Sequence, residues 1–197
     1  MLARVIATLA RAMSIRRKQL AALGGATLVV LAGGCSFDRG PDIDSATKFD
    51  RFPIYWLGAE FEGRELSHVT AEDWSTAAVL IYGTCEPSGT FEPSCRPPIS
   101  IQIFPLCYHI DSVALPPRER RRVIRGAPVG TQDGAPVLLT QRTQIKVYRG
   151  EGTDPGIALR ALEALRSLNS VSPVISATDP IPPPSPGVVD GERPCTD

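Results

Sequence analysis

The sequence has few of the residues and motifs that most often carry enzyme chemistry. Its 197 residues include only two histidines, His68 and His109, and neither has a second metal-ligating side chain at helical or hairpin spacing. The chain also lacks a GxSxG, SxxK or HExxH signature, a phosphate-binding glycine loop and a CxxC pair. These absences leave no motif for zinc catalysis, nucleotide binding or thiol–disulfide exchange.

One local pair resembles a catalytic arrangement. His109 and Asp111 are alternate residues, and alternate residues of a strand share a face. A histidine in a loop without a catalytic role is far commoner, and we therefore assign no catalytic residue, no metal and no cofactor. An active site assembled from distant residues stays open, because catalytic triads form across the sequence.

The chain as a whole has no net charge, but its charged residues are distributed unevenly. The 21 basic residues balance the 21 acidic ones, yet all the acidic residues follow Cys35 while five of the basic ones precede it. The part after Cys35 therefore carries an acidic excess of five. A negative domain of this size argues against general nucleic-acid binding, and about 163 residues suffice for one domain.

Long apolar runs are also missing, with one exception near the amino terminus. Arg16, Arg17 and Lys18 precede an uncharged stretch over 20–34, which ends in small residues at Cys35. This order of basic, apolar and small residues is typical of a secretory signal. The stretch is too short, and too often interrupted by glycine, for the roughly 20 apolar residues of a transmembrane helix.

The end of that stretch, Leu31-Ala32-Gly33-Gly34-Cys35, resembles the lipobox of bacterial prolipoproteins. The resemblance covers Met13–Cys35 only. It implies that the thiol of Cys35 receives a diacylglyceryl group and that the signal is cut between Gly34 and Cys35. The expected location is then the extracytoplasmic face of the cell membrane, where the acyl chains are the anchor and the membrane is the partner.

Two points about the leader stay open. Met13 and Met1 are both suitable starts, and Arg16-Arg17 leaves general secretion and twin-arginine export as alternatives. The chain after Cys35 also looks broadly like uncharacterised lipoproteins of high-GC bacteria, which implies no particular activity.

The remaining cysteines are Cys85, Cys95, Cys107 and Cys195. An even number outside the cytoplasm favours two disulfides, whereas a zinc site would need close pairs that are absent. Four cysteines allow three pairings. The most local pairing, Cys85–Cys95, closes a loop worth roughly 2–3 kcal/mol and leaves Cys107 with Cys195, which would attach the carboxyl-terminal tail to the body.

Polar and proline-rich stretches divide the chain into parts. We expect a signal peptide over 1–34, a lipidated cysteine with a flexible tether over 35–51, a single domain over 52–170 and a proline-rich tail over 171–197. Within the domain, short apolar or alternating runs predict strands, and Asp133-Gly134 predicts a hairpin turn. The expected strands lie at 52–57, 66–69, 77–82, 99–104, 123–124, 137–140 and 143–148.

A helix is predicted over 155–169, with Asp154 as its N-cap and Pro155 in its first turn. The apolar residues Ala158, Ala161 and Leu162 recur at helical spacing, which indicates one face packed on a sheet. The fold class is therefore α+β: an antiparallel sheet of about five or six strands, covered by one carboxyl-terminal helix and held by disulfides.

One basic segment is the candidate for binding an anionic surface. Its arginines are Arg118, Arg120, Arg121, Arg122 and Arg125. Lipid head groups, an envelope polymer or an acidic protein partner would suit them, although such runs are more often solvated loops. We therefore expect a binding or envelope-interaction module of unknown molecular activity. The alternative is an envelope hydrolase whose site is assembled from scattered residues.

Overall fold

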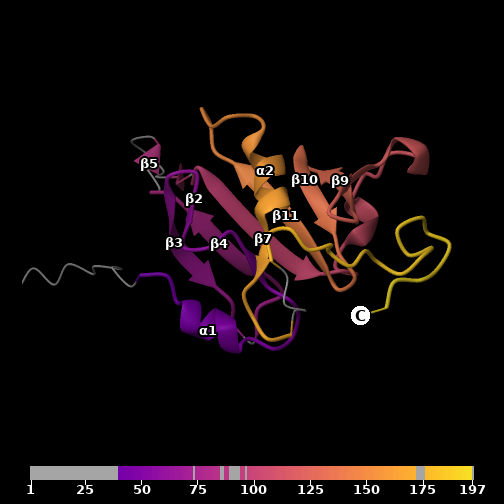
Figure 1. Cartoon of the computed structure of the whole chain (residues 1–197), viewed down its shortest axis with the longest axis horizontal. Helices are drawn as coiled ribbons and strands as arrows, with labels where there is room; N and C mark the ends of the chain where they lie inside the picture. The colour runs from indigo at the N-terminus through magenta and orange to yellow at the C-terminus, as the bar shows by residue number, and fades with distance from the viewer. Residues whose placement is uncertain are drawn as a thin grey trace, which may run out of the picture. The chain divides into compact units, whose positions relative to one another are not determined.

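A computed structural model describes residues 40–72, 74–84, 97–171 and 176–196, and the backbone alone at 87–88 and 94–95 (Figure 1). Gly34 and Cys35 lie outside the described residues. No helix within the described part is long and apolar enough to cross a bilayer. The elements in chain order are α1 (Ile43–Lys48), β1 (Tyr55–Trp56), β2 (Glu60–Phe61), β3 (Arg64–Thr70), β4 (Ala78–Tyr82), β5 (Pro87–Ser88), β6 (Ser94–Cys95), β7 (Ile99–Pro105), η1 (Ile110–Ser112), η2 (Arg118–Arg120), β8 (Arg122–Ile124), β9 (Ala127–Gln132), β10 (Ala135–Leu139), β11 (Thr143–Arg149), α2 (Ile157–Ala164) and β12 (Arg166–Ser167).

The main sheet is antiparallel and has eight strands in the order β2-β3-β4-β7-β11-β10-β9-β8. The α+β class is confirmed, with eight strands where the sequence predicts about five or six. The additional strands are β2 and β9, which the sequence assigns to a loop and to glycine- and proline-rich turns. Strand β9 escapes prediction because it contains Pro128 and Gly130, two residues that are uncommon inside strands. Pro128 lies opposite Val123 of the three-residue edge strand β8.

One predicted hairpin turn is confirmed, and two predicted strands pair with each other. Strands β4 and β7 pair directly, with Tyr82 opposite Ile99. Asp133-Gly134 forms the two-residue turn between β9 and β10, and both residues have positive φ, 50° and 76°. Positive φ at both positions is the requirement of a type I′ hairpin, which glycine meets without strain.

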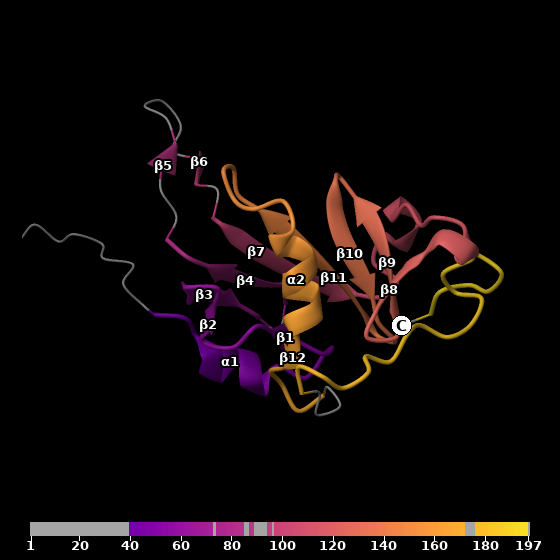
Figure 2. The same cartoon turned by 45° about the horizontal axis from the view of Figure 1, so that its top comes forward.

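Helix α2 covers one face of the sheet, across β11 and β10 (Figures 1 and 2). Its buried side chains are Ile157, Ala158, Ala161 and Leu162, as the helical spacing predicts. The predicted range 155–169 is wrong at both ends. Asp154 instead accepts a hydrogen bond from the Gly156 N–H (2.9 Å) ahead of the helix, and the chain leaves the helix after Ala164 because β12 pairs with β1.

The amino-terminal segment is part of the fold and not wholly a tether. Helix α1 lies within the predicted tether 35–51, and Asp42 caps it by accepting a hydrogen bond from the Ser45 N–H (3.0 Å). Ala46, Phe49 and Phe52 are buried in the core, with the two phenyl rings edge to face. Burial of these apolar side chains stabilises an ordered segment where the polar composition suggests a flexible one.

The buried Asn169 fixes this segment to the end of the domain. Its amide nitrogen donates to the carbonyl oxygens of Phe49 (2.8 Å) and Phe52 (2.9 Å), and its Oδ1 accepts the Ile54 N–H (2.9 Å). Both the amide nitrogen and the amide oxygen therefore have partners away from water, as a buried polar network requires.

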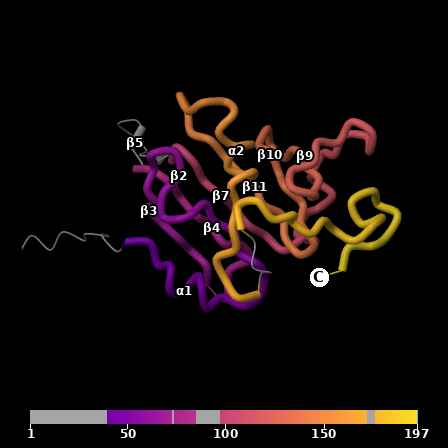
Figure 3. Tube along the Cα trace, in the orientation of Figure 1, coloured from indigo at the N-terminus to yellow at the C-terminus, as the bar shows by residue number. Residues whose placement is uncertain are grey.

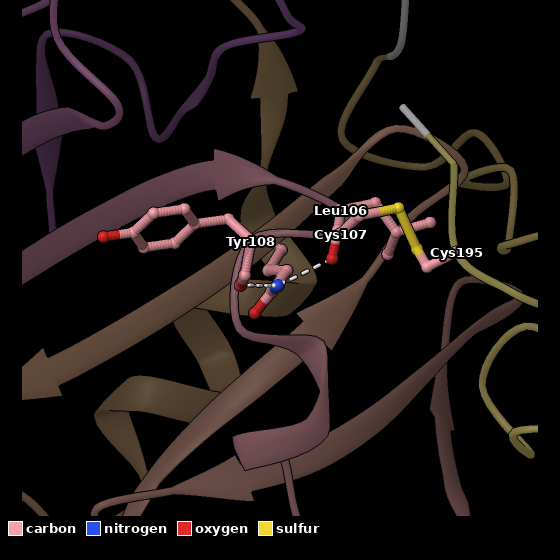
Figure 4. Close-up of a disulfide and its surroundings, with 5 residues drawn as sticks. Leu106, Cys107, Tyr108 and Cys195 are labelled. Carbon is pink, nitrogen blue, oxygen red and sulfur yellow. Dashed lines mark hydrogen bonds between the residues drawn. A yellow bond between two sulfur atoms is a disulfide. The ribbon is translucent and has the colours of Figure 1, made fainter.

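The carboxyl-terminal segment 176–196 lies against the body, and Figure 3 traces its path (yellow). Ile181 is fully buried in the main core, and Val188 and Val189 pack on a second apolar cluster on the opposite face of the sheet from α2. The predicted Cys107–Cys195 disulfide is confirmed (Figure 4). Cys85 and the side chain of Cys95 lie outside the described residues.

Candidate ligand groove and its surroundings

A groove of about 660 Å³ runs between helix α2 and the strands β9, β10 and β11. The antiparallel register places Val129 opposite Leu138 and Thr131 opposite Pro136, so alternate side chains of β9 and β10 form one apolar surface. Ala158 and Leu159 of α2 form the facing wall. The groove has the size and the largely apolar lining that small-molecule sites have in other proteins.

The groove exists because the helix covers only part of the sheet. Val129 of the floor and Ala158 of the wall are buried, whereas Pro136 and Leu159 are half-buried. A helix is about 10 Å wide and an eight-stranded sheet is several times wider, so the strands beyond β10 extend past α2. The uncovered strip next to the helix is the groove.

Charged side chains stand around this apolar lining. Arg122 of β8 lies 3.4 Å from a carboxylate oxygen of Glu163 on α2, and Arg149 donates to the carbonyl oxygen of Thr153 (3.3 Å). Both arginines line the groove and are exposed. They provide hydrogen-bond donors that can orient a polar group of a ligand bound on the apolar floor.

The Asp133-Gly134 turn at one end of the groove is held by a side chain from the opposite face of the sheet. Lys146 Nζ lies 2.7 Å from the carboxylate of Asp133 and 4.7 Å from the centre of the Tyr148 ring, with 5% of its side chain exposed. Burial acts to lower the pKa of Lys146, but the hydrogen bonds to Asp133 and Tyr148 outweigh it, so that this pKa is raised. The amine is therefore charged at neutral pH and neutralises Asp133.

Neither histidine lines the groove. His68 is exposed on β3, where its Nε2 lies 2.7 Å from the hydroxyl of Thr70. His109 has a φ of 51° and precedes η1, so His109 and Asp111 lie in a turn and not along one strand face. The expected geometry for a local catalytic pair is thus absent at this position.

The five arginines of the basic segment do not form one continuous patch. Arg118, Arg120 and Arg122 are exposed, but Arg121 pairs with Asp190 (2.8 Å). Arg125 donates to the carbonyl oxygens of Asp179 (2.7 Å), Leu165 and Ser176, and burial lowers its pKa. Two of the five therefore attach the tail to the body, Arg122 pairs with Glu163 (3.4 Å), and Arg118 and Arg120 present positive charge to solvent.

The aromatic side chains that a sugar or peptide groove would need are dispersed. Tyr55 and Tyr82 are core residues, and burial raises the pKa of Tyr82 to about 12. Trp74 is 81% exposed, and Tyr108 stacks on Phe104 on the other side of the sheet from α2. None of these rings lines the groove beside α2.

Sequence reasoning misses the groove because its floor depends on β9. The alternating apolar residues Ala127 and Val129, ahead of the predicted Asp133-Gly134 turn, are the signal that could have revealed β9. Within the described part of the chain, no three histidine, cysteine or acidic side chains gather as metal ligands would.

Comparisons with known proteins give no relative. No family model, no curated protein and no solved structure matches the chain.

Proposed function

We propose that the protein is a lipid-anchored, extracytoplasmic binding module and that the groove beside α2 is its ligand site. The groove carries this proposal: it combines an apolar floor at Val129 and Pro136 with two exposed arginines at its margin. Such a site favours a small ligand with an apolar body and a hydrogen-bonding group. The absence of both histidines from the groove supports binding over hydrolysis.

Two observations support the location. The Leu31–Cys35 sequence resembles a lipobox, and two or three acyl chains anchor a protein firmly where one does not. The Cys107–Cys195 disulfide fits an oxidising compartment, since the cytoplasm keeps most thiols reduced. The exposed Arg118 and Arg120 add an electrostatic attraction to anionic surfaces.

The anchor is tested by the intact mass of membrane-extracted protein before and after reduction. We expect a chain that starts at Cys35, carries added acyl mass and gains about four protons on reduction, as two disulfides require. An unmodified chain that retains its first residues contradicts the proposed anchor and location.

The groove is tested by titrating the isotope-labelled protein with a small-molecule fragment library and following amide NMR shifts. We expect the shifts to gather at Thr131, Gly150 and Leu159, which line the groove. The variant Thr131→Trp fills the groove from an exposed position and abolishes binding, whereas Thr76→Trp, at an exposed position that does not line the groove, leaves it unchanged. Shifts that gather elsewhere contradict the assignment.

The hydrolase alternative has its own control. Purified protein is incubated with chromogenic ester and amide substrates. If the parent protein hydrolyses a substrate and His68→Gln or His109→Gln does not, the protein is an enzyme and the binding-module proposal is wrong.

A further inference from the structure

The proline-rich stretch of the tail is held in one orientation on the body. The segment Ile181–Pro186 has the sequence IPPPSP. Proline fixes φ near −65°, and a residue before proline is driven to extended backbone, so the segment favours the polyproline II helix with three residues per turn.

Burial along the segment follows the same period of three up to the turn that ends it. Ile181 and Pro184 are buried, whereas Pro183, Ser185 and Pro186 are exposed. The segment ends in a turn in which the Val188 N–H donates to the carbonyl oxygen of Ser185 (3.2 Å) and Gly187 has a φ of 85°. One edge of the polyproline helix therefore faces the body, and Pro183 and Pro186 form a ridge toward solvent. We call these two residues the proline ridge.

The ridge is fixed by contacts at both ends. The Ile181 N–H donates to the carbonyl oxygen of Arg125 (2.6 Å), and the carbonyl oxygen of Pro182 accepts the Gln141 N–H (2.8 Å). Beyond the ridge, the Arg121–Asp190 ion pair and the Cys107–Cys195 disulfide attach the following residues. A partner that binds the ridge thus meets a conformation that is already ordered, which lowers the entropic cost of association.

The basic segment lies directly beside the ridge. Figures 1 and 2 both place the tail next to the turn that carries η2 and β8. A hollow of about 240 Å³ between them is lined by Arg118, Arg121 and Pro128 on one side and by the prolines of the tail on the other. The exposed charge of Arg118 is therefore next to the proline ridge.

We propose that the proline ridge and Arg118 form a docking surface for a protein domain whose groove is lined by aromatic side chains and flanked by carboxylates. Aromatic grooves receive pairs of prolines spaced three residues apart, because the polyproline helix places both on one side. A carboxylate at the margin of such a groove pairs with the neighbouring guanidinium. This surface is separate from the groove beside α2, and the inference does not depend on that groove.

The test measures binding of the detergent-extracted, oxidised full chain to purified SH3 domains, whose grooves have the required aromatic and acidic lining. We expect saturable binding. Pro183→Ala and Pro186→Ala should each raise the Kd about tenfold or more. Pro182→Ala, in the same segment but off the ridge, should change it less than about twofold. Arg118→Gln should weaken binding and reduce its dependence on salt.

A synthetic peptide of residues 178–188 separates the outcomes. If the peptide binds the domains and the full chain does not, the body hides the ridge and the proposal is overturned. If neither binds, the segment is not a ligand of this kind, and the proposal is again overturned. An equal loss in Pro182→Ala and Pro183→Ala also contradicts it. Each variant is first checked for the Cys107–Cys195 disulfide and an unchanged melting temperature.

Discussion

Arg160 of α2 forms a two-pronged ion pair with Glu62, 98 residues earlier in the chain. Its Nε and Nη2 donate to the two carboxylate oxygens of Glu62 at 2.7 and 2.9 Å, and its Nη1 lies 2.8 Å from Asp154. The pair joins the helix to the turn between β2 and β3. It therefore connects the covering layer to the sheet at the edge farthest from the groove.

This pair predicts a stability loss in acid. The hydrogen bond and charge of Arg160 hold the pKa of Glu62 below its usual value near 4.5. A carboxyl whose pKa is lower in the folded state stabilises the fold above its unfolded pKa, and this contribution is lost as the pH falls through the folded value. Urea unfolding between pH 6 and pH 3 should therefore show a shallower decline in Glu62→Gln than in the parent chain. Equal slopes would show that the pair is unimportant, and Glu60→Gln is the control.

Asn169 predicts a large effect of a single buried amide. Asn169→Ala leaves the carbonyl oxygens of Phe49 and Phe52 and the N–H of Ile54 without their partner. Buried groups that lose a partner cost about 1–3 kcal/mol each, so we expect a loss of about 2–4 kcal/mol after partial hydration of the site. Thr47→Ala, which removes an exposed hydroxyl that donates to the backbone carbonyl oxygen of Asp44, should change the free energy of unfolding by less than about 0.5 kcal/mol. Similar losses in both variants would contradict the role of Asn169.

The Cys107–Cys195 disulfide predicts a stability loss on reduction. It closes a loop with a sequence separation of 88, for which the chain-entropy model gives about 4–5 kcal/mol. The double variant Cys107→Ser, Cys195→Ser should unfold at a clearly lower urea concentration, and limited proteolysis should cut first after residue 186. A tail that stays protected in the variant would mean that Ile181 and the contacts of Arg125 hold it without the disulfide.

The close packing around Gly130, beneath the groove, predicts that a side chain at this position destabilises the fold. A Cβ at this position would lie 2.6 Å from Cγ1 of Val113 and 3.0 Å from the carbonyl oxygen of Ala114. Gly130→Ala should therefore destabilise the fold by about 1–3 kcal/mol through overpacking. Gly40→Ala meets no atom within 4 Å and is the matched control in a thermal melt. An unchanged melting temperature in Gly130→Ala would show that segment 113–115 moves freely.

The sequence predicts those parts of the fold that depend on local pattern. Three features are each encoded within a few neighbouring residues: the alternation of Ile99, Ile101 and Ile103, the Asp133-Gly134 turn and the apolar face of α2. The end of α2 cannot be predicted from local pattern. Leu165 continues the helical pattern, but the helix stops because β12 pairs with β1, more than a hundred residues earlier in the chain. Helix α1 is missed for a related reason: so short a helix depends on the long-range contacts of Phe49 and Phe52 in addition to its local cap at Asp42.

The candidate site depends even more on long-range arrangement. Val129 and Pro136 become a ligand surface only when β9 pairs with β10 and α2 lies alongside. The roles of Arg121 and Arg125 follow from the path of the tail and not from the arginine run itself. The period of three in the proline segment was readable from the sequence, but which of its sides faces outward was not.

The contacts of Asn169 also set an order of events during synthesis. The ribosome makes the amino end first. Asn169, which hydrogen-bonds to Phe49, Phe52 and Ile54, is therefore made 115 to 120 residues after them. Helix α1 contacts β3, and strands β3, β4 and β7 can pair in that interval. The backbone groups of Phe49, Phe52 and Ile54 gain their final partner only after residue 169 has appeared, so a ribosome-bound chain truncated before that residue lacks these three hydrogen bonds at its beginning.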